Sequence, residues 1–324
     1  MRYARELREF LERRGLKSGV IVGLAQSPGA MAVADGSLDF VYLDGATEYG
    51  PVGDLLRDWY PKVREGGFFG GLGYLDGLLH GKLYGVRTAV NEFAHEHRLI
   101  VRLTLDQVQT WFVFKPEEKP RPRPRIGLLT AYDHRQRDIA AISTPNKSKY
   151  CKLHGYDFIE ETSGFPTDRS AVWAKIPLLQ RHLKNHDWVF WSDADSLVMD
   201  LHKPLEAFCD PEADMVICHE DLGVGVYNVN AGQMLFRSCD WSQDFLEDVW
   251  EQTWALKDAH QEQRAIIHLL FSREVGERVA VVAQKTFNCY PSNYAKGDFL
   301  LHFPDMPADK RLEAMRYWAQ FAIP

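Results

Sequence analysis

The sequence predicts an α/β protein built from two units, which span residues 1–114 and 125–324. Three observations support this fold class. Strand-like and helix-like segments alternate in both parts of the chain, as in folds whose helices pack on a sheet. Residues 115–124 read KPEEKPRPRP, a density of proline that excludes helix and favours an extended linker. At 324 residues and 45% hydrophobic content, the chain can fill one large or two ordinary domains.

The first unit begins with a predicted helix at residues 2–14, which ends at Gly15. Strand-like runs follow at residues 19–24, 39–43 and 68–71. Amphipathic patterns predict helices at 52–60 and 86–95. Residues 99–103 and 110–114 are expected to form closing strands.

The second unit opens with a predicted strand at residues 125–130, which leads into a helix at 139–154. A short strand at 157–160 and a helix at 171–184 come next. Residues 188–191 are apolar throughout and predict a buried strand. Further strands are expected at 215–218, 233–236 and 299–303, and helices at 242–256 and 261–270. The alternation predicts a mixed α/β sheet.

Composition and charge exclude several classes of protein. The formal net charge of −7 gives no general attraction to nucleic acid or to an anionic membrane. The five cysteines form no Cys-X-X-Cys pair, and their odd number prevents a complete set of disulfides within one chain. No apolar signal-peptide core and no run of roughly 20 apolar residues is present. We therefore expect reduced thiols, no membrane span and a cytoplasmic location.

Two carboxylates at the end of the 188–191 strand are the most informative feature. Asp193 and Asp195 flank Ala194, and the end of a strand is where α/β proteins bind ligands. Paired carboxylates suit Mg²⁺ or Mn²⁺, and such ions hold diphosphates. The alternative is a solvated turn or a cap of the following segment.

The second unit resembles the galactosyltransferase family of yeast α-galactosyl- and α-mannosyltransferases and plant xyloglucan xylosyltransferases. The resemblance rests on five stretches in family order: YCKLHGY at 150–156, WAKIPLL at 173–179, WSDAD at 191–195, NAG at 230–232 and GDFLLHF at 297–303. It implies a GT-A type fold and metal-dependent transfer from a nucleoside diphosphate sugar. It also implies that the anomeric configuration is retained.

By this resemblance, Asp193, Asp195 and His302 are the expected metal ligands. A mixed carboxylate and imidazole set is compatible with Mn²⁺, whereas Mg²⁺ prefers oxygen ligands alone. The metal would act as a Lewis acid on the leaving group. For His302 the alternative is a surface position or a satisfied place in the core.

The donor is expected to contact several further segments. Thr130, Ala131, Tyr132 and Asp133 end the first strand of this unit and would lie near the base and ribose, unless they form a plain loop. Lys175 would neutralise phosphate, or is a solvated helix lysine. Trp173 is expected in the core. Asn230 would bind sugar hydroxyls, with Ala231 and Gly232 allowing close approach to the backbone; the alternative is a turn that enters a strand.

Gln263 and Glu262 are the candidate catalytic residues. By resemblance, Gln263 lies near the anomeric carbon, and a neutral amide favours front-face attack over double displacement. Glu262 is the carboxylate that could serve as a nucleophile, or it is a favourable acid in the first turn of a helix. The lysine that the family carries after the final histidine is missing. Lys310 is the expected phosphate-binding substitute, with Arg311 as the alternative.

The first unit resembles the later half of a class I methyltransferase. The matching stretches are DFVYLDG at 39–45, WYPKVREGG at 59–67 and GVRTAV at 85–90. The glycine-rich loop that binds S-adenosylmethionine would precede these stretches. Ala46-Thr47 and Leu72-Gly73 stand where metal-binding variants carry ligands. The resemblance therefore implies a truncated, Rossmann-like domain, whose exposed sheet edges would be covered either by another chain, as in a homodimer, or by the second unit.

The sequence thus predicts a metal-dependent glycosyltransferase that uses UDP in preference to GDP and a glycan or another hydroxyl compound as acceptor. Two alternatives stay open: an S-adenosylmethionine-dependent methyltransferase, and a non-catalytic carbohydrate-binding or scaffold protein.

Overall fold

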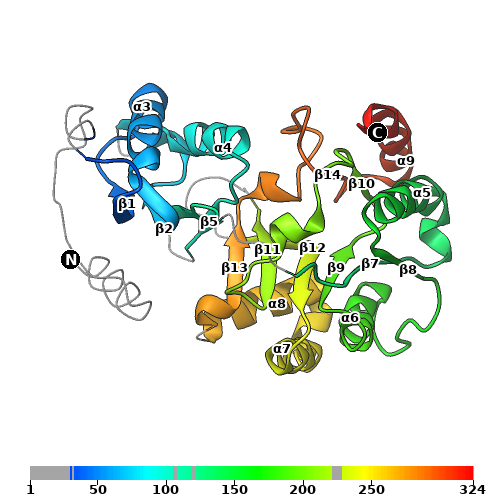
Figure 1. The fold of residues 1–324 in the computed structure, drawn as a ribbon. Helices are drawn as coiled ribbons and strands as arrows, with labels where there is room; N and C mark the ends of the chain where they lie inside the picture. Colours follow the sequence, from blue (N-terminus) through cyan, green and yellow to red (C-terminus); the bar gives the residue numbers. More distant parts are fainter. Residues whose placement is uncertain are drawn as a thin grey trace. The chain divides into compact units, whose positions relative to one another are not determined.

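A computed structural model describes residues 30, 33–79, 81–104, 108–117, 122–220, 228–273 and 275–323 of the chain (Figure 1). The chain divides into two compact units, Met1–Pro120 and Arg121–Pro324. The division falls inside the segment predicted as the linker. The helix and strand predicted at residues 2–14 and 19–24 lie outside the described residues.

The first unit has a sheet in the order β1-β2-β6-β5. Strands β1 (Leu38–Leu43) and β2 (Val63–Leu72) run parallel and are connected through helix α3 (Tyr49–Trp59). Strand β6 (Thr110–Phe114) is antiparallel to β2, and the short β5 (Arg102–Leu103) is antiparallel to β6. Helix α4 (Val86–Glu96) packs against α3, and a hairpin of β3 (Asp76–Leu79) and β4 (Lys82–Gly85) precedes it.

The second unit has a mixed sheet in the order β13-β11-β12-β9-β7-β8. Its strands are β7 (Ile126–Ala131), β8 (Asp157–Glu161), β9 (Trp188–Ser192), β11 (Met215–His219), β12 (Val229–Arg237) and β13 (Val279–Val282). Strands β8, β7 and β9 are parallel to one another, while β12 is antiparallel to both of its neighbours. Strand β9 is buried along its whole length, as expected for a central strand with both faces covered.

Helices cover both sides of this sheet (Figure 1). Helices α6 (Lys175–Leu183), α7 (Asp240–Trp250) and α8 (Gln261–Ser272) lie on one side, and α5 (Arg137–His154) and α9 (Ala308–Trp318) on the other. A second, small sheet pairs β10 (Ser196–Val198) with β14 (Leu300–His302). It brings a segment near the end of the chain beside the turn that follows β9.

Several elements differ from those predicted. A 3₁₀ turn at Ala171–Ala174 precedes α6, so the helix expected at 171–184 begins only at Lys175. The helix predicted at 242–256 ends at Trp250 and is followed by a 3₁₀ segment, Thr253–Lys257. Strands β10 and β13, the β3–β4 hairpin and helix α9 were not predicted. Within the described residues, no helix combines the length and the apolar character that crossing a bilayer requires.

Candidate functional site

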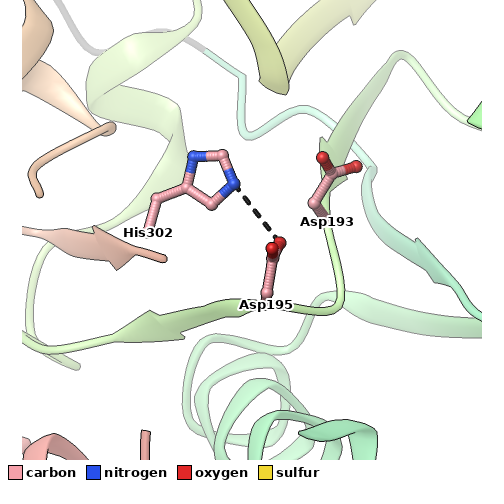
Figure 2. Close-up of side chains that lie close together, drawn as sticks. All are labelled: Asp193, Asp195 and His302. Atoms are coloured by element: carbon pink, nitrogen blue, oxygen red, sulfur yellow. Dashed lines mark ion pairs between the residues drawn. The ribbon is translucent and has the colours of Figure 1, made fainter. Parts of the chain in front are cut away.

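Two acidic side chains and one imidazole meet beside the turn that follows β9. Asp193 and Asp195 come from this turn, and His302 is the last residue of β14 (Figure 2). The pairing of β10 with β14 places Ser196 opposite His302, which fixes the imidazole next to Asp195. One ligand atom from each of the three side chains lies within 4.8 Å of the others. The three residues predicted as metal ligands therefore form one cluster.

A hydrogen bond from the second ring nitrogen orients His302. Its Nδ1 lies 2.9 Å from Oδ1 of Asn288, and its Nε2 lies 3.3 Å from Oδ1 of Asp195. With an amide oxygen as its partner, Nδ1 carries the proton, so Nε2 has a free lone pair in the neutral ring. A metal-binding histidine commonly has such a second hydrogen bond. Sequence reasoning did not identify Asn288.

The two carboxylate oxygens of Asp193 have different surroundings. Oδ1 accepts a hydrogen bond of 2.7 Å from the indole of Trp191 and lies 3.5 Å from Nζ of Lys175. A β-carbon added to Gly232 would lie 3.0 Å from Oδ2, so this oxygen faces the glycine. One oxygen is thus held by the protein, while the other faces the middle of the cluster.

Gly232 provides the space in which the cluster forms. An added β-carbon would clash with Cε1 of His302 and would lie 2.9 Å from Oδ1 of Asn230. The carbonyl of Gly232 also accepts a hydrogen bond of 2.8 Å from the amide of Asp193. The three-residue set fits a cation in its donor chemistry, and the arrangement of its side chains requires a glycine at position 232.

Asp195 also contacts a cation from α9. Its Oδ2 lies 3.1 Å from Nη1 of Arg311, a residue of the first turn of this helix. Burial opposes ionisation of Asp195, but neighbouring positive charges, that of His302 when its ring is protonated and that of Arg311, outweigh it and hold the pKa of the carboxyl below its ordinary value. Asp195 is therefore a carboxylate at neutral pH, as a metal ligand must be.

Lys175 is buried and belongs to an ion-pair network. Its Nζ lies 2.8 Å from Oε1 of Glu262 and donates a hydrogen bond of 3.2 Å to the carbonyl of Ala231. Burial disfavours the ammonium form, yet Asp193 and Glu262 raise the pKa of Lys175 above its ordinary value. The interpretation of Lys175 as a solvated helix lysine is wrong. Trp173 is fully buried, as expected for a core residue.

The segment from Asn230 to Gly232 lies inside β12 and is not a turn that enters a strand. A register shift in the β11–β12 pairing makes this end of the strand irregular. Oε1 of Gln263 accepts a hydrogen bond of 3.0 Å from the amide of Ala231. The side chain of Asn230 donates to Oε1 of Glu220 at 3.2 Å and accepts from the amide of Gly232 at 2.9 Å.

The residues expected near the base and ribose lie at the carboxyl end of β7, beside β9. Thr130 is buried, Ala131 ends the strand and Tyr132 donates a hydrogen bond to Glu160. Asp133 caps the next 3₁₀ turn by accepting from the amide of Arg135 at 2.9 Å. This is the edge at which an open α/β sheet binds ligands.

Lys310 does not join the cluster. Its side chain is exposed, and its Nζ lies 3.4 Å from Oε2 of Glu313, three residues further along α9. Successive residues of a helix point about 100° apart, so the helix turns Arg311 inward and Lys310 outward. The structure thus places Arg311, which the sequence offered as the alternative, beside the cluster, and Lys310 away from it.

The comparison with family models concerns the second unit. The model of the galactosyl transferase GMA12/MNN10 family matches residues 124–212 and 206–310. "Probable glycosyltransferase 2" of Oryza sativa subsp. indica is 34% identical over 142 residues, which are 40% of this chain and 29% of that protein. "Galactomannan galactosyltransferase 1" of Cyamopsis tetragonoloba is 33% identical over 113 residues, 32% of this chain and 26% of that protein. The chain thus spans less than a third of the length of either relative.

Among solved structures, a glycosyltransferase involved in the glycosylation of the major capsid of PBCV-1 is similar in fold. Its TM-score is 0.51 at 23% sequence identity, and the match covers 60% of this chain and 100% of that chain.

Proposed function

Because the chain belongs to the galactosyl transferase GMA12/MNN10 family of glycosyltransferases, we propose that its second unit transfers a sugar from a nucleoside diphosphate sugar to a hydroxyl group of a glycan or another acceptor. UDP is preferred to GDP as the nucleotide. The observation that carries the proposal is the cluster of Asp193, Asp195 and His302, whose ligand atoms lie within 4.8 Å of one another.

These three residues would hold Mn²⁺ or Mg²⁺, with Mn²⁺ favoured by the imidazole. A divalent cation at this place supplies Lewis-acid stabilisation of the departing diphosphate. The protein contributes the geometry: Asn288 fixes the ring of His302, and Trp191 fixes one oxygen of Asp193. Base and ribose would lie along Thr130–Asp133, at the neighbouring strand end.

Arg311 is the candidate for charge stabilisation of the leaving group. Its guanidinium stays charged and can bind phosphate through two N–H groups. Its Nη2 donates to the carbonyl of Met306 at 2.9 Å, while its buried Nε has no hydrogen-bond partner among the described residues. Because Nη1 of this guanidinium lies 3.1 Å from Oδ2 of Asp195, its charge is close to the place where a diphosphate held by the cation would be.

The surroundings of the two candidate catalytic residues support front-face attack with retention. The carboxylate of Glu262 is held by Lys175, which lowers its availability as a nucleophile. The amide of Gln263 is neutral and is tied to the backbone of β12. The first unit is proposed to be a methyltransferase-like domain. The parallel β1–β2 pair, connected by a helix, supports a Rossmann-like origin. Homodimer formation and a cytoplasmic location stay predictions.

Calorimetry with nucleotides tests the proposal directly. UDP is expected to bind the full chain in the presence of Mn²⁺, more tightly than GDP and at least about tenfold more tightly than without metal. S-adenosylmethionine is expected to release no heat. Asp195→Ala should abolish the effect of metal, and Arg311→Gln should weaken UDP binding while Lys310→Gln, its exposed neighbour, leaves it unchanged. Absence of nucleotide binding with metal would refute the proposal.

A further inference from the structure

A buried lysine of α5 contacts the turn that carries the two aspartates. Lys147 is 0% exposed, and its Nζ donates to the carbonyl of Asp193 at 2.6 Å, to that of Ser192 at 3.2 Å and to Oγ1 of Thr130 at 3.4 Å. An ammonium group has three donors, and these three oxygens use all of them. The lysine therefore joins the end of β7 to the turn after β9.

The preceding residue, Asn146, holds the other side of the same turn. Its Oδ1 accepts from the amide of Val198 at 2.8 Å, and its Nδ2 donates to the carbonyl of Val198 at 2.9 Å. One side-chain amide thus satisfies both backbone groups of a residue in β10, as a neighbouring strand would. Asn146 and Lys147 together contact the backbone before and after Asp195.

The positive charge of Lys147 is explained by the two carboxylates of Asp193 and Asp195. Burying an ammonium group is costly, and its three hydrogen-bond partners are all neutral oxygens. A neutral polar residue could hold the same carbonyls at a smaller cost. A buried cation is useful here because it offsets the mutual repulsion of two carboxylates held close together.

From these contacts we infer that Asn146 and Lys147 are positioning residues, which we call the α5 clamp, and that the clamp holds the Asp193–Asp195 turn in the shape that binds a divalent cation. The inference rests on the proposed function, because it assigns the two residues to the proposed metal site. Ser196 completes the arrangement: its Oγ donates to the carbonyl of Asp193 at 2.7 Å and lies 2.9 Å from Oγ of Ser192. Neither clamp residue contacts the metal or the sugar; both act through the backbone of the turn.

Metal titration of the full chain with Mn²⁺ alone tests the clamp. The variants are Lys147→Met and Asn146→Ala, with Lys149→Met as the control, because Lys149 is an exposed lysine of the same helix. Electron paramagnetic resonance measures free Mn²⁺, and thermal melting without metal measures folding. We expect the Kd for Mn²⁺ to rise at least about tenfold in both clamp variants and to stay unchanged in the control. We also expect the rise in Tm caused by Mn²⁺ to shrink in the clamp variants alone.

The outcomes separate the clamp from the proposed function. If the unmodified protein binds neither Mn²⁺ nor UDP, the proposed function and the clamp both fail. If it binds Mn²⁺, and a folded Lys147→Met protein binds the ion equally well, only the clamp is overturned. Should Lys147→Met fail to fold, Asn146→Ala decides, because Asn146 is only partly buried and is truncated without leaving a buried charge. Normal Mn²⁺ affinity in that variant would then overturn the inference.

Discussion

The absence of a side chain at Gly232 leaves the space that the side chains of His302 and Asn230 occupy. The position lies inside β12, where a β-carbon would meet the ring of His302 and the side chain of Asn230. We expect Gly232→Ala to push His302 away from Asp195 and to reduce Mn²⁺ affinity and transfer at least about tenfold. Overpacking of this kind costs about 1–3 kcal/mol. Calorimetry with Mn²⁺ and a donor-hydrolysis assay measure the two effects.

The matched control is Gly50→Ala. Gly50 lies in α3, its added β-carbon would meet nothing within 4 Å, and its φ angle is not in the left-handed region. Alanine favours a helix more than glycine does, so this variant should keep full activity and at least its original stability. Equal Mn²⁺ affinity in Gly232→Ala and the unmodified protein would contradict the packing argument.

Individual residues were predictable where their signal is local. Asp193 and Asp195 directly follow an apolar strand, so their place at the sheet edge follows from the sequence. His302 could be brought to them only through resemblance, because the β10–β14 pairing joins segments about a hundred residues apart. Lys147 looks like any helix lysine in the sequence, and only the structure shows its burial. Arg311 was offered beside Lys310 without a means of choosing, since α9 had not been predicted.

At the scale of elements, one buried ion pair connects two helices to the edge of the sheet. Lys175 begins α6, Glu262 lies in the first turn of α8, and both are buried. We expect Lys175→Met to destabilise the protein by about 3–5 kcal/mol, because it leaves the carboxylate of Glu262 buried without its partner. Urea denaturation measures the change in the free energy of unfolding.

A double variant tests whether the lost stability comes from the buried carboxylate of Glu262 that is left without a counter-ion. Replacing both residues, as Lys175→Met with Glu262→Leu, should recover part of the lost stability, because the buried carboxylate disappears together with its counter-ion. Lys310→Met, which breaks an exposed pair with Glu313, should change the free energy of unfolding little. If the double variant is less stable than either single variant, the desolvation argument is wrong.

Elements with a regular apolar pattern were predicted better than very short or mostly polar ones. The strand at 110–114 and the start of the helix at 261–270 coincide with β6 and α8. Strand β10 has three residues, too few for a period of two to show, whereas β14 lies inside the strand expected at 299–303. Helix α9 has a polar sequence with one buried residue, Met315, so its apolar face gave little signal. These elements bring Arg311 and His302 to the turn, which explains why the site was only partly predictable.

At the scale of the whole molecule, each of the two units has buried apolar residues of its own. In the first, Leu56 and Val90 are buried in helices α3 and α4, and in the second, Phe190 and Phe236 are buried in β9 and β12. The proline-rich segment predicted the boundary, because proline excludes regular structure locally. What the first unit does could not be predicted in the same way, since its sequence carries a fold pattern without a chemical site. Residues 2–24, whose predicted helix and strand belong to that pattern, lie outside the described residues.

The fold comparison provides a test at this scale. The similar solved glycosyltransferase matches over 100% of its own chain but only 60% of this chain, so the shared fold does not need the whole of this chain. We therefore expect a fragment of residues 122–324 to fold alone and to bind UDP with Mn²⁺ within about threefold of the affinity of the full chain. Circular dichroism should show one cooperative thermal transition. A fragment that folds cooperatively but binds no nucleotide, when the full chain does, would show that the first unit contributes to the donor site. A fragment without a cooperative transition would show that the two units fold as one.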